Sequence, residues 1–182
     1  MIATAVLSLT ISSFSQNYTS AKAAKVSPPP RVRRVVLVSI ADRRLAVIED
    51  DTVLAYFPVA VGAALSPSPT GEFEIVNRVT DPAYYHNGVV IAAGEKNPIG
   101  TRWIGLNSKG YGIHGTNAPK SIGQAASHGC IRLKNRDVER LFSMLRVGDV
   151  VKIHGERDDE TAEVFGAAID APTAETAQMS GQ

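Results

Sequence analysis

Short runs of β-branched residues, each ended by glycine, proline, asparagine or aspartate, are the feature that most constrains the fold of this chain. Residues 34–40 and 44–49 form the first two runs, and the three residues between them are enough for a hairpin turn. Asp50 and Asp51 predict a second turn, followed by a third strand over residues 53–61. Strands this short and this often interrupted predict a mainly β fold, an antiparallel-rich sandwich or open barrel. Further strands are predicted at residues 72–77, 89–92, 103–106, 112–114 and 150–154.

One helix is clear in the sequence. Asn135 has the chemistry of an N-cap, Asp137 suits the positive end of the helix dipole, and Gly148 is placed to end the element. We interpret this helix as scaffold. The apolar residues that recur at helical spacing, and therefore share one face, are Val138, Leu141, Phe142 and Leu145.

The two ends of the chain differ in composition from the part between them. Residues 2–11 are apolar or small, and an Ala-Lys-Ala site ends at Ala23, which predicts a signal peptide over residues 1–23. No lysine or arginine precedes the apolar run, so a merely apolar tail is the competing interpretation. Residues 24–33 form a Pro-rich linker. Residues 155–182 are acidic and poor in large apolar side chains, which predicts a mostly disordered tail.

The charge balance limits the classes of partner. The net charge of the chain is +1, which argues against a dedicated nucleic-acid binder. No apolar run approaches the roughly 20 residues that span a bilayer, so we expect no membrane span. Residues 24–154 alone carry a net charge of +6. That excess favours an anionic substrate or, equally, an ordinary solvated surface whose counter-charge lies in the tail.

The side chains that could take part in a reaction are concentrated between His114 and Arg132. Cys130 is the only cysteine, and His128 stands two residues before it. A thiol attacks only after losing its proton, which an imidazole such as His114 can accept. A guanidinium such as Arg132 can stabilise the negative charge of the thiolate. Backbone N–H groups at Gly129 and Cys130 offer hydrogen bonds to an oxyanion. Together these residue types predict acyl transfer through a thioester.

Each of these residues also has a structural interpretation. A lone cysteine is most often a small buried hydrophobe, although an unpaired thiol in an exported protein is more often retained for its reactivity. Arg132 is equally suited to a structural ion pair. His86 and His154 have no comparable neighbours in the sequence, so we expect them to be surface or core residues.

The motif resembles that of a known family, the L,D-transpeptidase (YkuD-type) catalytic domain. The family signature is a histidine, a gap of a dozen or more residues, then Ser/Thr-His-Gly-Cys, a hydrophobic residue and Arg or Asn. Here His114 is followed, after twelve residues, by residues 127–132, Ser-His-Gly-Cys-Ile-Arg. The resemblance covers residues 34–154. Its flanking blocks are Pro-Thr-Gly-Glu-Phe at residues 69–73, Asn-Pro-Ile-Gly at 97–100, Ile-His-Gly-Thr-Asn at 113–117 and Val-Gly-Asp at 147–149.

The resemblance implies roles for individual residues. Cys130 looks like the nucleophile that attacks the L,D-peptide bond before the terminal D-Ala of a tetrapeptide stem. His114 looks like the general base, oriented by the backbone carbonyl of Gly115. Arg132 looks like a residue that binds a substrate carboxylate or organises the site. The residues that fall where the family builds its oxyanion hole and lines the site are Ser127, His128 and Gly129, with Gly115 beside them.

The resemblance also implies partners and leaves more than one function open. Donor and acceptor would be peptidoglycan stem peptides, with no metal or organic cofactor, and the domain would act as an exported monomer in the periplasm or cell wall. Water as the acceptor would make it an L,D-carboxypeptidase instead. A catalytically silent wall-associated module and a sortase-like transpeptidase are two further hypotheses. A sortase has no reason to contain the His-Gly-Cys turn at residues 128–130.

Overall fold

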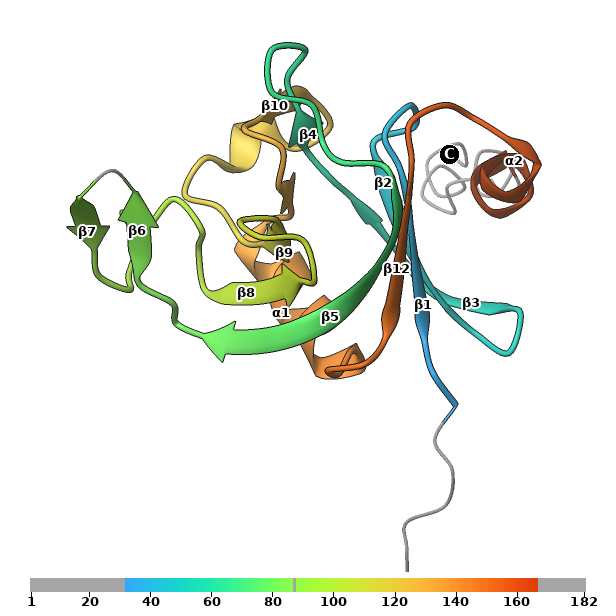
Figure 1. Ribbon diagram of the computed structural model, residues 1–182, viewed down its shortest axis with the longest axis horizontal. Helices are drawn as coiled ribbons and strands as arrows, with labels where there is room; N and C mark the ends of the chain where they lie inside the picture. The colour runs from blue at the N-terminus through green and yellow to red at the C-terminus, as the bar shows by residue number, and fades with distance from the viewer. Residues whose placement is uncertain (1–31, 87, 167–182) are drawn as a thin grey trace, which may run out of the picture. The chain divides into compact units, whose positions relative to one another are not determined.

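An eight-stranded sheet organises the part of the chain that the computed structural model describes, residues 32–86 and 88–166 (Figure 1). The predicted signal peptide, most of the linker and the end of the predicted tail lie outside the described residues. Within the described part, no helix is long and apolar enough to cross a membrane. In spatial order the strands are β11 (Ile131–Arg132), β9 (Gly112–His114), β8 (Arg102–Leu106), β5 (Gly71–Thr80), β12 (Val150–His154), β1 (Val35–Ser39), β2 (Arg44–Glu49) and β3 (Thr52–Pro58).

The first three strands form the antiparallel meander that the sequence predicts. β2 pairs with β1 on one side and with β3 on the other. Asp50 and Asp51, at the predicted second turn, both have positive φ, of 48° and 58°. Short polar residues tolerate this conformation better than most, which suits a tight two-residue hairpin. The third strand ends at Pro58, earlier than predicted, because Ala60 leaves β2 and exchanges backbone hydrogen bonds with Arg132.

β5 joins the two halves of the sheet. Residues 71–74 pair with β12 and residues 75–80 pair with β8, with an irregular register between Ile75 and Asn77. The strand curves across this junction, and the sheet curls with it (Figure 1). The mainly β, open-barrel prediction is therefore confirmed. Most pairs are antiparallel, but β1 with β12 and β9 with β11 are parallel.

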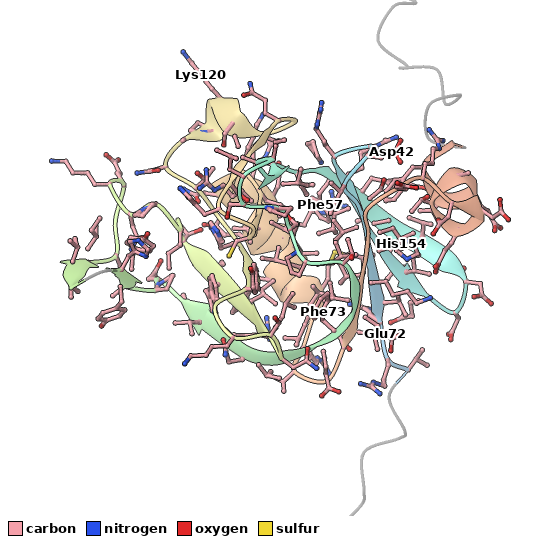
Figure 2. All side chains as sticks on the ribbon, turned by 45° about the horizontal axis from the view of Figure 1, so that its top comes forward. Asp42, Phe57, Glu72, Phe73, Lys120 and His154 are labelled. Atoms are coloured by element: carbon pink, nitrogen blue, oxygen red, sulfur yellow. The ribbon has the colours of Figure 1, made fainter. Side chains whose placement is uncertain are left out.

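Two small pairs of strands complete the β structure. β4 (Val61–Gly62) pairs in parallel with β10 (Ala125–Ser127). β6 (Tyr84–His86) and β7 (Val89–Ile91) form a separate antiparallel hairpin that extends beyond β5 and β8 (Figure 1). A short 3-10 helix, η1 (Pro119–Ser121), precedes β10, and its Lys120 projects outward (Figure 2).

The main hydrophobic core lies inside the curl of the sheet. Helix α1 (Asn135–Met144) packs there against β8 and β9, with Val138 and Leu141 buried. Phe57 lies among the enclosed side chains (Figure 2). Full burial of an apolar side chain of this size contributes about 1.5–3 kcal/mol. The core further contains Val36, Val38, Leu45, Val47, Ile75, Ile104, Ile113, Ile131, Leu133, Leu145, Val151 and Ile153.

The predicted helix is confirmed, but its predicted cap is wrong. Lys134 is the N-cap and makes no side-chain capping bond, whereas Asn135 is the first helical residue. Asp137 lies in the first turn, as its charge favours. The side chain of Asn135 bonds elsewhere, to the loops that support the candidate site.

The expectation of disorder from residue 155 onward, and of a single helix, is corrected by α2 (Asp159–Gly166). Phe165 of this helix is fully buried against Leu37 and Ala46, on the face of β1 and β2 opposite the main core. Adjacent residues of a strand point to opposite faces, so Val36 and Val38 reach the main core while Leu37 meets α2. The predicted tail beyond Gly166 lies outside the described residues.

Candidate active site

Parallel pairing of β9 with β11 brings the two halves of the sequence motif together. Arg132 lies opposite His114 in the register, and Ile131 lies opposite Ile113. Cys130 directly precedes β11 and therefore lies beside Gly112, at the start of β9. The residues between the two strands form η1 and β10 before the chain returns. The twelve-residue gap is thus the crossover between two neighbouring parallel strands.

The turn before Cys130 is held by Ser127. The buried Ser127 Oγ donates a hydrogen bond to the carbonyl of Cys130 at 2.6 Å and accepts one from the N–H of Gly129 at 3.0 Å. Gly129 has a φ of +108°, and a Cβ there would lie 2.7 Å from the ring of Tyr111. Both the conformation and the space therefore require glycine. The N–H of Gly129 is already engaged, so it is not the donor that an oxyanion would meet.

His114 is buried, with only 4% of its surface exposed, and its ring orientation is determined by two contacts. Nδ1 donates to the carbonyl of Gly115 at 2.5 Å, the contact that the resemblance implies. A carbonyl only accepts, so the proton of the neutral ring is on Nδ1 and the lone pair is on Nε2. The indole of Trp103 stacks on the imidazole, with ring centroids 5.7 Å apart and planes at 21°.

The electrostatic setting keeps His114 uncharged. The pKa of His114 is lowered to about 4, chiefly by burial, with the Gly115 carbonyl acting in the opposite direction and the charge of Arg132 adding to the lowering. At neutral pH the imidazole is therefore an unprotonated base with Nε2 available.

The thiol of Cys130 is also uncharged at rest. Sγ is half-buried and donates to the carbonyl of Gly110 at 3.5 Å. Burial raises the pKa of the Cys130 thiol, whereas the backbone of Gly112 and the charge of Arg132 lower it by smaller amounts. The pair is consequently a thiol and a neutral imidazole.

Arg132 supplies the positive charge of the site. Its Nη1 donates to the carbonyl of Ala126 at 3.3 Å. Its Nε is buried and has no hydrogen-bond partner among residues 32–86 and 88–166. A guanidinium with unused donors is suited to a carboxylate or another anion.

Asn135 connects the loops that support the site, a role the sequence did not reveal. Its Oδ1 accepts from the N–H of Thr116 at 3.1 Å and of Thr101 at 3.4 Å. A Cβ at Gly100 or Gly115 would lie 2.1 or 2.2 Å from this oxygen. These glycines therefore let the amide reach both loops. The paired Asn-Pro-Ile-Gly and His-Gly-Thr blocks were the available signal, but nothing in the sequence linked them to Asn135.

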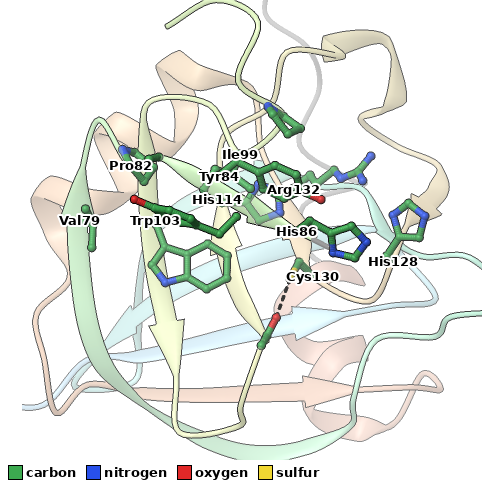
Figure 3. A pocket seen from close by; sticks show the side chains of 14 residues that line it. Val79, Pro82, Tyr84, His86, Ile99, Trp103, His114, His128, Cys130 and Arg132 are labelled. Atoms are coloured by element: carbon green, nitrogen blue, oxygen red, sulfur yellow. Dashed lines mark hydrogen bonds between the residues drawn. The ribbon is translucent and has the colours of Figure 1, made fainter. Parts of the chain in front are cut away.

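A pocket of about 890 Å³ opens over Cys130 (Figure 3). Of the predicted residues, His114, His128, Cys130 and Arg132 line it, and His128 is exposed to solvent. The predicted site-lining residues Ser127, Gly115 and Gly129 are not on its wall, because their contacts hold the backbone behind it. The other lining residues, mostly apolar or aromatic, are Val79, Pro82, Ala83, Tyr84, Tyr85, His86, Pro98, Ile99, Trp103 and Gly110.

Two histidines outside the motif, expected to be surface or core residues, have surroundings that the sequence did not reveal. His86 lies on the pocket wall, carried there by the β6–β7 hairpin. His154 lies at the end of β12, where Nδ1 bonds to Asp158 and Nε2 approaches Glu160 at 3.4 Å. Neither placement was predictable from local sequence, because each depends on strands and helices that meet only in the folded chain.

Comparison with known proteins agrees with the motif. The profile of the YkuD-type L,D-transpeptidase catalytic domain matches residues 33–153. A Bacillus licheniformis protein named as the L,D-transpeptidase YkuD is 41% identical over 125 residues, which cover 69% of this chain and 68% of the relative. The Escherichia coli protein named as the L,D-transpeptidase ErfK/SrfK is 32% identical over 155 residues. That match covers 76% of this chain, which spans about half the length of the relative.

Solved structures share the fold. An L,D-transpeptidase from Mycobacterium tuberculosis matches with a TM-score of 0.59 at 19% identity, over 68% of this chain and 58% of that one. An L,D-transpeptidase from Enterococcus faecium matches with a TM-score of 0.58 at 22% identity, over 67% of this chain and 50% of that one. With the profile match over most of the described residues, these findings place the chain in the YkuD-type L,D-transpeptidase catalytic domain family.

Proposed function

We propose that this chain exchanges peptide bonds in peptidoglycan, with Cys130 as nucleophile and His114 as general base. One observation carries the proposal. The parallel β9–β11 pair places a thiol and a neutral, oriented imidazole on the wall of one pocket, beside an arginine whose Nε has no partner in the described part of the chain. Family membership supports the reaction class, and the pocket chemistry supports the roles of the residues.

Acylation begins with the L,D-peptide bond of a tetrapeptide stem in the pocket. Sγ of Cys130 attacks the carbonyl carbon while Nε2 of His114 takes the thiol proton. The carbonyl oxygen becomes an oxyanion near the N–H of Cys130, which bonds to no other described residue, unlike the N–H of Gly129. The carbon–nitrogen bond then breaks, the proton passes from His114 to the departing nitrogen, and D-Ala leaves. A thioester on Cys130 remains.

Deacylation determines the product. An amine from a second stem peptide gives a cross-link, and water gives a trimmed tripeptide stem. We expect transfer to an amine, as the family resemblance implies. Arg132 pairs with a carboxylate of the stem peptide. Consistent with this substrate, the chain is exported and acts at the cell wall as a monomer.

The test is incubation of the purified protein with tetrapeptide muropeptides, followed by mass analysis of the products. We expect D-Ala together with 3→3 dimers, and no D-Ala from a Cys130→Ala variant with wild-type thermal stability. A carbapenem, which carries an acyl group that a thiol can attack, should add its mass to the wild type and not to this variant. Undiminished D-Ala release by the variant would refute the thiol mechanism, and tripeptides without dimers would favour the carboxypeptidase.

A further inference from the structure

The β6–β7 hairpin carries a histidine into the pocket from outside the sequence motif. Tyr84 pairs with Ile91 and His86 with Val89, so Tyr84 and His86 lie on the same face of the hairpin. The two rings stack, with centroids 6.0 Å apart and planes at 21°. Figure 3 shows His86 lining the same pocket as Cys130 and His128. His86 is thus an exposed imidazole whose ring is held beside the nucleophile's pocket.

A buried amide fixes the base of this hairpin. Asn97 is fully buried, and its Nδ2 donates to the carbonyls of Pro82 at 2.8 Å, Ile91 at 3.3 Å and Ala92 at 3.2 Å. These carbonyls belong to both legs of the hairpin. Oδ1 of the same residue accepts from the N–H of Ile99, which also lines the pocket. These hydrogen bonds therefore fix the base of the hairpin whose strand β6 carries His86.

The aminolysis step releases one proton more than His114 can carry. An aliphatic amine has an ordinary pKa near 10.4, so it arrives as an ammonium ion. Attack on the thioester forms an amide, breaks the carbon–sulfur bond and removes two protons from the nitrogen. One proton goes by way of His114 to the Cys130 sulfur, and the other has to leave the site. His114 accepts protons only at Nε2, because its Nδ1 is bonded to the Gly115 carbonyl.

We propose that His86 accepts this other proton, deprotonating the incoming ammonium and passing the proton to solvent. This inference rests on the proposed function and assigns His86 to the acceptor half of the reaction. His86 is held by its stack on Tyr84, whereas His128, the third pocket histidine, makes no hydrogen bond or ring contact with another described residue. His86 shares a pocket with Cys130, is held by Tyr84 and is exposed to water, so it can exchange a proton with an amine in the pocket and with solvent.

The test compares acceptors that need this proton transfer with one that does not. His86→Gln should slow transfer of the acyl group to a stem-peptide amine at pH 7 at least about tenfold more than it slows D-Ala release in the acylation burst. Transfer to hydroxylamine, which is unprotonated at neutral pH, should be unchanged. The defect should also fade as the pH approaches the pKa of the amine. Val90→Gln, an exposed change on the same hairpin outside the pocket lining, is the matched control and should behave as wild type.

Three outcomes would overturn the inference. Wild-type transfer to the stem-peptide amine by His86→Gln would show that no proton passes through this residue. An equal loss with hydroxylamine would indicate that His86 shapes the pocket instead. Absence of D-Ala release by the wild type would refute the proposed function as well, which separates that failure from the first two.

Discussion

Two histidines at the ends of strands in the same sheet have opposite surroundings. His114 ends β9 inside the molecule, facing a carbonyl on one side and the charge of Arg132 nearby. His154 ends β12 at the surface, with carboxylates of Asp158 and Glu160 at its two ring nitrogens. The first ring is enclosed and its pKa is lowered, whereas the second contacts two carboxylates, of which Glu160 belongs to α2.

Further charged residues surround His154. Lys152 strengthens the surface link through an ion pair with Glu160 at 2.8 Å. Hydrogen bonds from the backbone and side chain of Thr161, and then from His154, lower the pKa of Asp158 to about 2. The same side-chain type is therefore neutral where burial excludes charge, and near the surface it contacts carboxylates that join β12 to α2. The predictions below test that division, from the largest expected effect to the smallest.

Replacing His114 should affect chemistry far more than any change near α2. His114→Gln keeps a polar side chain of similar length but removes the base, so the rate of D-Ala release should fall about 10²–10⁴-fold. His154→Gln should leave that rate within about twofold, because it lies outside the pocket lining. Burst kinetics with a tetrapeptide stem would measure both. A loss below tenfold for His114→Gln would contradict the assignment of the base.

Replacing Phe165 should affect stability rather than chemistry. Phe165→Ala removes the fully buried anchor of α2, and the free energy of unfolding should drop by about 3 kcal/mol. Urea denaturation would measure the loss, with the exposed Glu163→Ala as the control on the same helix. The rate of D-Ala release per folded molecule should persist at low temperature. A change of less than about 1 kcal/mol would mean that α2 contributes little to the fold.

The pH dependence of unfolding should separate the two histidines. The folded pKa of His114, about 4, lies below its ordinary value of 6.5. Between these values the unfolded chain takes up a proton that the folded chain excludes, so stability falls as the pH drops from 6.5 to 4. The fall attributable to His114 is up to about 3 kcal/mol. His114→Gln should lose this part of the pH dependence, whereas His154→Gln should retain it. A slope unchanged in His114→Gln would show that burial does not depress its pKa.

Much of the strand pattern and the core of the site could be predicted because both are local signals. Alternating apolar residues located β5, paired aspartates located the turn before β3, and one short motif contained Cys130, His128 and Arg132. Residue types at short spacing are enough for such predictions, because hydrophobic period and side-chain chemistry are properties of neighbouring residues.

Helix α2 was missed although a signal for it was present. β1 is buried on both faces, and its continuous run of apolar residues is typical of a strand covered on both sides. That run implied a further element over Leu37 without saying which part of the chain supplied it. The segment around Phe165 is too polar in average composition to predict a packed helix, and one aromatic anchor at the right position decided the outcome.

By itself, the sequence determined a mainly β domain, the presence of one thiol with a histidine and an arginine in a recognisable motif, and the reaction class that these groups can carry out. Only the tertiary structure decided the charge states of Cys130 and His114, the support of the loops by Asn135 and the entry of His86 into the pocket. The physical reason is that burial and hydrogen bonding depend on residues distant in the chain. These distant partners set pKa values and ring orientations, and no local pattern encodes them.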